Sequence, residues 1–465
     1  MPTGPYRFCP SLLRAYDIRG VVGETLTETD AYYVGRALAT FLQPRARPVA
    51  VGRDGRLSSP MLEAALICGL QESGCTVWSI GLSSTPLLYY TVIDQACAGG
   101  VMVTGSHNPA NYNGFKMMRG SSALFGQEIL TIGDIAAAGN FTNGKGRVVQ
   151  YAPKAAYIAR LLEDMSFSPE LRIVWDTGNG AVGPILQDLI ERFPCFSLVI
   201  NAQVDGHFPA HPPDPSCPEH LQEMCSLVRQ EKCSIGIAFD GDGDRLGVVD
   251  ECGNSVSTDH LLMLFAKDVL ARHPNATIIA DIKTSQTFFD EVKRWGGYPV
   301  MVKTGHSIIK TCLQKTGALF AGEISGHLFF ADTWYGFDDG LYASLRLLSL
   351  LSQHKEPLSA LVHTLPPLYT MPEQYIPCTE ARKKIVLDRV IRRLQQEGVN
   401  FVTIDGVRVM TAHGWWLLRA SNTQDCLTTR AEGFSHEGLA FVQKDLQQYL
   451  GYGLGGTLEE SASYA

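Results

Sequence analysis

The sequence lacks the features of a membrane, secreted or nucleic-acid-binding protein. No apolar run reaches the roughly 18 residues of a membrane span, and the N-terminus shows no charged-then-apolar signal pattern. Lys and Arg number 39 against 47 Asp and Glu, so the net charge is -8, and no basic run occurs. We therefore expect a cytoplasmic protein with neither a membrane nor a nucleic acid as its partner.

Cysteine is present but follows no pattern. The 12 cysteines include no C-x-x-C pair and no regular framework, which is typical of reduced thiols in protein cores. We expect neither a disulfide scaffold nor a zinc site. Hydrophobic residues make up 45% and charged residues 18% of the 465 residues. This composition is that of a globular protein, and the length predicts roughly three or four domains.

The segment 98–109 reads A-G-G-V-M-V-T-G-S-H-N-P, an apolar run followed by turn residues. The run predicts a strand that presents Ser106 and His107 at its tip. A hydroxyl beside an imidazole at such a place indicates a nucleophile, or a hydroxyl that carries a phosphoryl group. An ordinary strand that ends in a polar turn is the alternative.

A second segment, 235–245, reads I-G-I-A-F-D-G-D-G-D-R. Asp240, Asp242 and Asp244 alternate with glycines, so three carboxylates can converge on one hard divalent cation. A calcium EF-hand loop shares this spacing, but it needs glycine where Arg245 stands, and a strand instead of a helix follows at 246–249. A solvated acidic turn is the remaining alternative.

Together the two segments resemble the phosphoserine loop and the metal loop of the alpha-D-phosphohexomutases. G-E-I-S-G-H at 322–327 and R-A-S-N-T at 419–423 are similar to that family's sugar-binding and phosphate-binding loops. The four motifs follow the family's order and cover nearly the whole chain. The sequence is therefore identified as a member of this family, and it most resembles the bacterial phosphomannomutase/phosphoglucomutase branch.

The resemblance implies a four-domain α/β architecture, in which three related α/β domains precede a smaller α+β C-terminal domain. Alternating strand and helix patterns in the first three units favour the same fold. We interpret the proline-rich segment 365–377 as a linker. The expected domains are 1–151 with the phosphoserine loop, 152–253 with the metal loop, 254–366 with the sugar-binding loop, and 367–465 with the phosphate-binding loop.

Local patterns define the fourth unit most clearly. Val386, Val390 and Leu394 recur at every fourth position, which predicts a helix over 380–397 that packs through this apolar stripe. The pair Asp405-Gly406 is typical of a hairpin turn, and the strand after it leads into the phosphate-binding motif. That motif departs from the family, because Gln424 and Asp425 replace the usual Thr-Pro and add negative charge near the expected phosphate.

The resemblance implies a role for each candidate site residue. The catalytic group comprises Ser106, His107, Lys116 and Arg245. The Mg²⁺ ligands are Ser106, Asp240, Asp242 and Asp244. The substrate-binding residues are Tyr16, Arg19, Lys283, His306, Glu323, Ser325, His327, Arg419, Ser421, Asn422, Thr423 and Arg430.

The residue types suit these roles. Glu323 and Ser325 supply an acceptor and a donor for neighbouring sugar hydroxyls. Arg419 offers a guanidinium fork that suits a non-transferred phosphate, with hydroxyl and amide groups beside it. Lys116 could transfer a proton to or from a sugar hydroxyl if its neighbours lowered its pKa, and His107 is the other candidate for proton transfer.

The implied reaction is reversible phosphoryl transfer between O1 and O6 of mannose or glucose phosphates, through phosphorylated Ser106 and a hexose 1,6-bisphosphate. Mg²⁺ is the implied cofactor, glucose 1,6-bisphosphate the activator, hexose phosphates the small-molecule partners, and a monomer the expected state. One alternative is a phosphoglucosamine mutase, whose sugar loop usually has Gln in place of Ile324. The others are a hexose 1,6-bisphosphate synthase and a non-catalytic hexose-phosphate-binding regulator.

Overall fold

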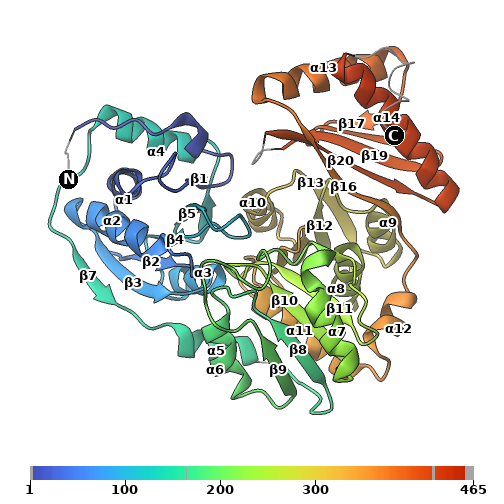
Figure 1. Ribbon diagram of the computed structural model, residues 1–465, viewed down its shortest axis with the longest axis horizontal. Coiled ribbons are helices and arrows are strands. Elements are labelled where there is room, and N and C mark those ends of the chain that lie inside the picture. The colour runs from blue at the N-terminus through green and yellow to red at the C-terminus, as the bar shows by residue number, and fades with distance from the viewer. Residues whose placement is uncertain (1–3, 45, 164, 422–424, 456–465) are drawn as a thin grey trace.

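Four successive units, each built on its own sheet, make up the computed structural model (Figure 1). It describes residues 4–44, 46–163, 165–421 and 425–455. None of the helices in these ranges combines the length and the apolar character that a membrane crossing requires.

The first unit is a mixed sheet with helices on both faces. A short turn of 3-10 helix, η1 (Pro10–Leu12), precedes it. The strands are β1 (Ile18–Val21), β2 (Val49–Arg53), β3 (Thr76–Leu82), β4 (Gly99–Val103), β5 (Tyr112–Arg119), β6 (Ser122–Leu124) and β7 (Arg147–Gln150). They pair in the order β1-β5-β4-β2-β3-β7, with β6 on β5. The helices are α1 (Glu28–Leu42), α2 (Ser59–Glu72), α3 (Thr85–Asp94) and α4 (Gln127–Ala138).

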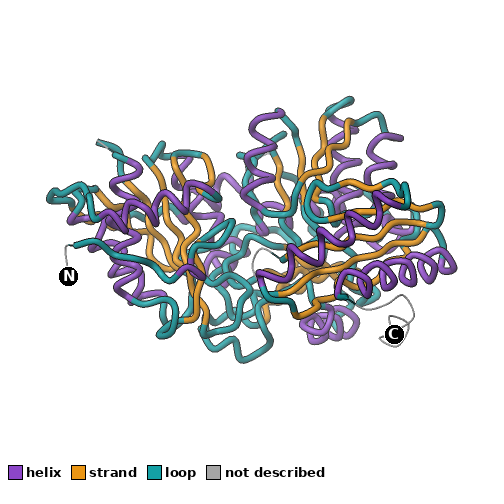
Figure 2. Tube along the Cα trace, turned by 90° about the horizontal axis from the view of Figure 1, so that it is seen from above, coloured by secondary structure: helices purple, strands orange, loops and turns teal. Residues whose placement is uncertain are grey.

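Side-chain alternation along the strands explains the two covered faces of this sheet. Val49 and Val51 of β2 belong to the core formed with α1, α2 and α4, whereas Ala50 faces the core formed with α3. Both faces are therefore apolar, as in other sheets with parallel strands. Figure 2 shows the result from above, with strands lying between helices.

The second and third units have smaller sheets. The second contains β8 (Arg172–Asp176), β9 (Phe196–Ile200), β10 (Ile235–Phe239) and β11 (Leu246–Asp250), with α5 (Lys154–Leu162), α6 (Gly183–Ile190), η2 (Pro218–Leu221) and α7 (Gln222–Gln230). The third contains β12 (Thr277–Asp281), β13 (Tyr298–Val302), β14 (Phe320–Gly322) and β15 (Leu328–Phe330), with α8 (Thr258–Arg272), α9 (Gln286–Arg294), α10 (His306–Thr316), α11 (Gly340–Gln353) and α12 (Leu358–His363).

The first three units share one strand order. Their sheets contain the runs β5-β4-β2-β3, β11-β10-β8-β9 and β15-β14-β12-β13. If the four strands of each run are numbered along the chain, the order is 4-3-1-2 in all three, and the fourth strand is antiparallel to the third. The expectation of three related α/β domains is thus confirmed. The loop between the third and fourth strands carries the serine motif, the metal motif and the sugar motif in turn.

The fourth unit is an antiparallel sheet covered by two helices. Its strands are β16 (Tyr369–Pro377), β17 (Phe401–Val402), β18 (Val407–Thr411), β19 (Gly414–Ala420) and β20 (Cys426–Gly433), in the order β16-β20-β19-β18-β17, with α13 (Glu380–Gln396) and α14 (His436–Leu454). The predicted helix and hairpin are confirmed, and Val386, Val390 and Leu394 are buried.

The interpretation of 365–377 as a linker is wrong for most of its length. Residues 369–377 form β16, which pairs with β20. Pro372 is accommodated because β16 is an edge strand and its register shifts between Met371 and Gln374, where a residue without an N–H interrupts no continuous ladder. Proline content predicted an irregular segment, but pairing with β20 decides the structure.

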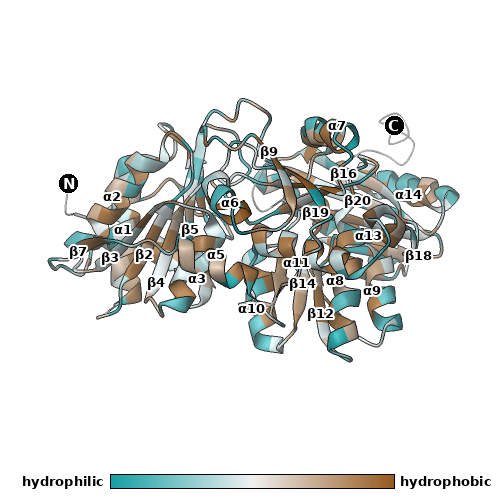
Figure 3. Ribbon diagram, turned by 90° about the horizontal axis from the view of Figure 1, so that it is seen from below, coloured by the Kyte–Doolittle hydropathy of each residue, from teal (hydrophilic) through white to brown (hydrophobic). Residues whose placement is uncertain are grey.

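The hydrophobic cores join the first three units and leave the fourth with a core of its own. One continuous hydrophobic cluster joins α3 of the first unit to the second and third units and contains Trp175, Phe239, Phe265 and Phe330. The fourth unit has a core of its own around Trp416. Figure 3 shows that hydrophobic and hydrophilic residues are separated in the third unit: β12 and β14 are largely hydrophobic, while α9 and α10 carry hydrophilic segments. Burial of the hydrophobic strands drives the packing of the helices on them.

Candidate active site

A cleft of about 740 Å³ receives side chains from all four units. Fourteen of the predicted site residues line it, namely Tyr16, Arg19, Ser106, His107, Lys116, Arg245, Lys283, His306, Glu323, Ser325, His327, Arg419, Ser421 and Arg430. Asp240, Asp242 and Asp244 are fully buried beside Ser106 and Lys116. Asn422, Thr423 and Gln424 lie outside the described residues.

The serine loop, residues 104–111 between β4 and β5, presents Ser106 in a left-handed backbone conformation with φ +49°. This conformation is uncommon for a residue with a side chain and persists only where the surroundings enforce it. The hydroxyl donates a hydrogen bond to Asp240 Oδ2 at 2.8 Å, and His107 Nδ1 lies 3.3 Å from Ser106 Oγ. Burial, reinforced by nearby Arg245 and Arg19, lowers the pKa of His107 well below its ordinary value.

The metal loop, residues 240–245, places three buried carboxylates together. One ligand atom each of Asp240, Asp242 and Asp244 lies within 4.8 Å of the others. Asp240 Oδ1 accepts the backbone N–H groups of Gly243, Asp244 and Arg245 at 3.0 to 3.2 Å, which shapes the loop around it. Burial and the two neighbouring carboxylates raise the pKa of Asp240 well above its ordinary value.

A hard divalent cation fits this donor set. Buried oxygens of Asp242 and Asp244 have no hydrogen-bond partner among the described residues, and buried polar atoms normally have one. Oxygen-only ligands are those that Mg²⁺ prefers. The strand β11 directly after Arg245 excludes the helix of a calcium EF-hand.

The pKa of Lys116 on β5 is raised, whereas the hypothesis of proton transfer by this residue required a lowered pKa. Its Nζ lies 2.7 Å from Asp242 Oδ2 and also pairs with Asp244. Burial acts to lower its pKa, but the charges of these carboxylates outweigh burial and raise it above the ordinary value. The condition for proton transfer by Lys116, a lowered pKa, is therefore not met, and the residue is held as a cation beside the metal loop.

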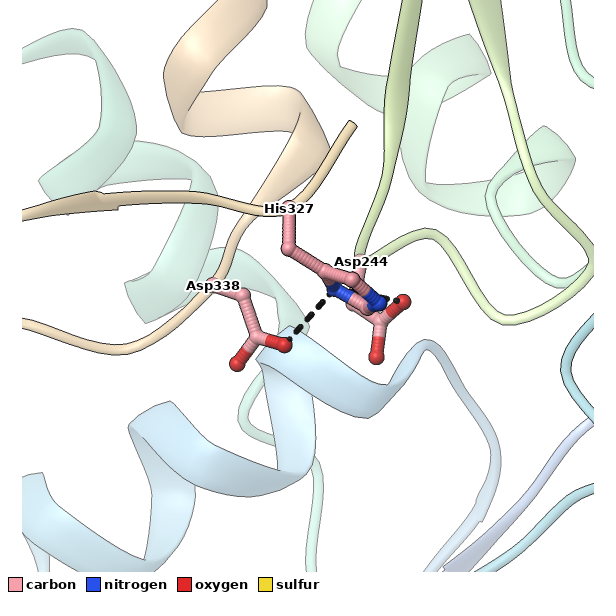
Figure 4. A group of neighbouring side chains, drawn as sticks. All are labelled: Asp244, His327 and Asp338. Atoms are coloured by element: carbon pink, nitrogen blue, oxygen red, sulfur yellow. Dashed lines mark ion pairs between the residues drawn. The ribbon is translucent and has the colours of Figure 1, made fainter. Parts of the chain in front are cut away.

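His327 links the metal loop to the third unit. Its Nδ1 lies 2.9 Å from Asp338 Oδ2 and 3.5 Å from Asp244 Oδ1. Dashed lines mark these two pairs in Figure 4. Arg245 Nε donates to His327 Nε2 at 3.1 Å. Because Nε2 accepts this bond, the proton of a neutral ring stands on Nδ1, toward the carboxylates. Asp338 also binds Lys310 Nζ at 2.8 Å, so its charge is already compensated.

The sugar-binding candidates lie close together on loops of the third unit. Glu323 is 2% exposed and accepts the backbone N–H of Gly305, while Ser325 Oγ donates to Glu323 Oε2 at 3.2 Å. Burial raises the pKa of Glu323. His306 begins α10 with its Nδ1 3.6 Å from Asp338, and burial lowers its pKa. Tyr16 donates its hydroxyl to the carbonyl of Thr304 at 2.7 Å.

The cationic candidates are each held by a carboxylate. Arg19 pairs with Asp17 and donates to Asn108 Oδ1 at 2.6 Å. Arg419 Nε and Nη2 both lie 3.0 Å from Asp405 Oδ2. Two further pairs join the third and fourth units: Arg430 with Asp259, and Lys283 with Glu373 at 3.3 Å. Ser421 lines the same part of the cleft. Asp425, the departure from the family, is exposed.

Several cleft residues were not predicted. Asp17 and Glu373 carry a charge opposite to that of the predicted cations, and Asp214 and Cys217 come from the loop between β9 and η2 of the second unit. No motif marks them, because isolated charges on loops are usually solvated surface groups. They reach the cleft only through the arrangement of the four units.

Every unit matches a family model. Residues 10–142, 155–253 and 257–369 match the alpha/beta/alpha domains I, II and III of phosphoglucomutase/phosphomannomutase, and residues 373–448 match its C-terminal domain. The fold and the four-unit cleft define a phosphohexomutase, an isomerase that moves a phosphoryl group on a hexose phosphate.

Similar proteins agree with this class. The chain is 44% identical over 434 residues to the phosphomannomutase/phosphoglucomutase of Pseudomonas aeruginosa, covering 93% of this chain and 94% of that one. It is 41% identical to the phosphoglucomutase of Neisseria gonorrhoeae, covering 93% and 95%. A phosphoglucomutase/phosphomannomutase family protein of Burkholderia thailandensis superposes with a TM-score of 0.90 at 39% identity, covering 97% and 99%. The chain belongs to the phosphoglucomutase/phosphomannomutase family of alpha-D-phosphohexomutases.

A more distant fold relative has been crystallised with ligands. The N-acetylphosphoglucosamine mutase of Aspergillus fumigatus is 14% identical to this chain, with TM-scores of 0.61 and 0.59 in two structures. They cover 97% and 96% of this chain, and 97% of each of those chains. One contains glucose 1,6-bisphosphate and the other GlcNAc-6P and magnesium.

Proposed function

We propose that the protein interconverts the 1-phosphates and 6-phosphates of glucose and mannose, with Ser106 as the carrier of the transferred phosphoryl group. The observation that carries this proposal is the position of Ser106 Oγ, 2.8 Å from Asp240 in a buried three-carboxylate cluster beside the cleft. A serine held next to a cation-binding cluster suits phosphoryl transfer, which depends on positioning and charge neutralisation.

The reaction runs through two transfers of opposite direction. In the first, the free hydroxyl oxygen of the hexose phosphate attacks phosphorus on Ser106, the Oγ–P bond breaks, and a hexose 1,6-bisphosphate forms. In the second, Ser106 Oγ attacks the other phosphorus, and the serine is phosphorylated again. In each transfer the attacking hydroxyl gives up one proton and the leaving oxygen takes up one, so no proton is gained or lost over the cycle. His107, kept neutral by burial and 3.3 Å from Ser106 Oγ, is our candidate for moving these protons.

Ser106, Asp240, Asp242 and Asp244 would hold Mg²⁺, which neutralises charge on the transferred group when it is bound. The magnesium complex of the Aspergillus relative supports this assignment. Lys116, held as a cation by Asp242, adds positive charge on the same side. Arg245 contributes another cation from the end of the metal loop.

The opposite wall of the cleft holds the sugar and the phosphate that does not react. Glu323 and Ser325 bind neighbouring sugar hydroxyls as acceptor and donor. Arg419, Lys283 and Arg430 bind the distal phosphate, with the Arg419 fork already aligned by Asp405. Tyr16, Arg19, His306, His327 and Ser421 are further substrate-binding residues, of which Arg19 and His327 stand next to the serine and metal loops. Asn422 and Thr423 are proposed partners of the same phosphate on sequence grounds.

The sugar loop favours neutral hexoses. Ile324 lines the cleft between Glu323 and Ser325, and its side chain offers neither a donor nor an acceptor for a 2-amino group. Phosphoglucosamine is therefore a poorer substrate in this proposal than glucose or mannose phosphates.

A coupled mutase assay tests the substrate assignment. Mannose 1-phosphate, glucose 1-phosphate and glucosamine 1-phosphate are supplied separately with Mg²⁺ and catalytic glucose 1,6-bisphosphate. Turnover of the first two sets their order of preference. Turnover of glucosamine 1-phosphate alone would move the assignment to a glucosamine enzyme, and a requirement for a second phosphoryl donor would identify a bisphosphate synthase.

Two controls test the chemistry. The Ser106→Ala variant lacks the carrier oxygen and is expected to lose nearly all turnover while it still binds hexose phosphate, so near-normal activity would defeat the scheme. Removal of Mg²⁺ with EDTA is expected to stop turnover, and added Mg²⁺ is expected to restore it. Activity that persists in EDTA would remove the carboxylate cluster from the mechanism.

A further inference from the structure

Arg56 is a buried guanidinium that the mechanism above does not use. It lies between β2 and α2, is 1% exposed, and is absent from the lining of the cleft. Its Nη1 donates to the carbonyls of Pro109 at 2.6 Å and Tyr112 at 3.0 Å. Its Nη2 donates to the carbonyls of Ser106 at 2.7 Å and Asn108 at 2.6 Å. One side chain thus binds four backbone carbonyls, which span the serine loop from Ser106 to the start of β5.

Asp54 completes the contact from the other side. Arg56 Nε lies 3.2 Å from Asp54 Oδ2, and this oxygen also accepts the hydroxyl of Thr104 at 2.8 Å and the backbone N–H of Gly105 at 3.2 Å. The Thr104 hydroxyl accepts the backbone N–H of Ser106 at 2.8 Å. The Arg56–Asp54 pair therefore reaches both the N–H and the carbonyl of Ser106.

The backbone of Ser106 needs such support. Its left-handed φ of +49° costs on the order of 1–3 kcal/mol in a residue with a Cβ and persists only when surrounding contacts enforce it. The loop and the guanidinium also touch without spare room, because a Cβ on Gly105 would lie 2.5 Å from Arg56 Cζ. A planar fork with five N–H donors can satisfy these carbonyls together, which the point charge of a lysine cannot.

The second unit covers the outer face of this guanidinium. Arg56 Cζ lies 5.1 Å from the centre of the Phe208 ring, a cation–π contact. The backbone of the second unit also approaches closely, since a Cβ on Gly206 would lie 2.9 Å from Arg56 Cα. The loop that contributes Phe208 continues to Asp214 and Cys217 in the cleft. The placement of Ser106 and the docking of the second unit thus share one side chain.

We propose that Arg56 is a positioning residue for phosphoryl transfer, which fixes the backbone of Ser106 so that its Oγ meets the metal loop. The inference rests on the proposed function, in which Ser106 carries the phosphoryl group. Arg56 touches neither the substrate nor the reacting atoms. Its loss therefore lowers the rate of transfer and leaves substrate binding intact, because the substrate groups stand on other elements.

The test compares Arg56→Lys with Arg36→Lys. Arg36 is a matched control: it lies in α1 of the same unit, is 4% exposed, and binds the carbonyl of Thr142 and the side chain of Asn143 away from the cleft. Displacement of a reacting group by about 1 Å can cost about 100-fold in rate. We expect kcat of Arg56→Lys to fall by that order. We expect KM, and Kd for glucose 6-phosphate measured on dephosphorylated protein, to stay within about twofold of wild type.

The kinetics can overturn the positioning role of Arg56 separately from the proposed function. A kcat loss no larger than that of Arg36→Lys overturns the inference, as does a rise in Kd that accounts for the loss. A parallel Ser106→Ala measurement separates the two proposals. If Ser106→Ala retains turnover, the proposed function fails. If Ser106→Ala is inactive and Arg56→Lys is normal, only the positioning role fails.

A second variant keeps the test open if Arg56→Lys does not fold. Thr104→Val removes the hydroxyl that links Asp54 to the Ser106 N–H and keeps the side-chain shape and Arg56 itself. It is expected to lower kcat with unchanged Kd. Phe208→Leu, which uncovers the guanidinium from the second unit, is expected to lower kcat by a smaller factor. Wild-type kcat in Thr104→Val would show that the network does not hold Ser106.

Discussion

Arg419 shows how a carboxylate behind a cation prepares it for a phosphate. Asp405 holds Nε and Nη2 from one side at 3.0 Å, so the fork is fixed before any ligand arrives. We expect Arg419→Lys to raise KM for glucose 1-phosphate about 10- to 100-fold, because hydrogen bonds to charged groups contribute about 1.5–3 kcal/mol. The change in kcat should be smaller, since a phosphate that does not react is bound alike in the ground and transition states.

Steady-state kinetics of Arg419→Lys and of Arg382→Lys checks this prediction. Arg382 is an exposed arginine of α13 in the same unit and lies outside the cleft, so its substitution should leave both constants unchanged. A large loss of kcat at unchanged KM for Arg419→Lys would assign the residue to the reacting phosphate instead.

Asp339 makes the stability of the protein depend on pH. Burial raises its pKa to about 7, although Tyr342 N–H and the Tyr157 hydroxyl donate to the carboxylate. An unfolded Asp has a pKa of about 3.9, so between about pH 4 and pH 7 the folded chain keeps a proton that the unfolded chain has lost. The free energy of unfolding therefore decreases as pH rises through this window.

Asp339→Asn removes this dependence because the amide stays neutral. The melting temperature of the variant minus that of wild type is therefore expected to increase from pH 5 to pH 8. Thermal unfolding of both proteins at the two pH values measures this difference. Parallel pH profiles for the two proteins would contradict the raised pKa.

Single residues also show how far the candidate site could be predicted from the sequence. Ser106, Asp240 and Glu323 stand in contiguous motifs whose residue types indicate their chemistry. The structure places Ser106 and Glu323 in one cleft and Asp240 buried beside Ser106. Asp54 and Arg56 carry no such signal, because a charged residue in a turn is normally solvated. The raised pKa of Lys116 also depends on carboxylates more than a hundred residues away in the chain.

Helix packing in the first unit depends on two glycines that pattern reasoning passes over. A Cβ on Gly69 of α2 would lie 2.1 Å from the carbonyl of Tyr32, and one on Gly35 of α1 would lie 2.3 Å from the carbonyl of Leu66. The two backbones are thus in direct contact where α1 and α2 cross. We expect Gly69→Ala to lower the free energy of unfolding by about 1–3 kcal/mol, as overpacking does, despite the better helix propensity of alanine.

Denaturant titration of Gly69→Ala beside Gly133→Ala tests this crossing. Gly133 in α4 is a matched helical position where an added Cβ would meet only the Leu13 Cδ1 methyl, at 2.7 Å. A flexible side chain can move where a carbonyl cannot, so Gly133→Ala should be close to neutral. Equal effects of the two substitutions would mean that the helices separate freely.

Whole elements were predictable where one signal dominated. The apolar stripe of α13 and the Asp405-Gly406 hairpin follow from local sequence, and both occur. The segment 369–377 was misread because its prolines argue against a strand, whereas its pairing with β20 is a long-range contact. The 4-3-1-2 strand order that the first three units share produces no residue-level repeat in the sequence. A topology constrains the hydrophobic pattern and the turn positions more than it constrains which amino acid stands at each position.

Across the whole molecule, the fourth unit is held by polar contacts and a small apolar cluster, while one hydrophobic cluster joins the α3 side of the first unit to the second and third units. The apolar cluster contains Ile282, Trp415 and Leu417. Arg408 of β18 donates to the carbonyls of Ile282 at 2.6 Å and Thr284 at 3.0 Å. The third-unit residues in these contacts, Ile282 and Thr284, lie in the loop between β12 and α9. The same loop carries Lys283 into the cleft.

Asp259 of α8 is one of the buried anions of this interface. It accepts the N–H of Ser285 at 2.8 Å and pairs with Arg430 of β20, and it is 4% exposed. Asp259→Ala leaves the buried Arg430 without its carboxylate, a loss on the order of 3–5 kcal/mol for buried pairs. Because the fourth unit has its own core, we expect this loss to loosen its docking without unfolding the rest of the chain.

Amide hydrogen exchange shows which units of Asp259→Ala lose stability. In Asp259→Ala, amides of β18, β19 and β20 are expected to exchange faster, while those of β4 and β10 keep their protection because they belong to the shared core. Asp268→Ala is the matched control, since Asp268 lies on the same helix but pairs with Arg272 and Arg346 of the third unit. Faster exchange across all four units would show that they unfold as one. Unchanged exchange in β20 would show that the apolar cluster alone holds the fourth unit in place.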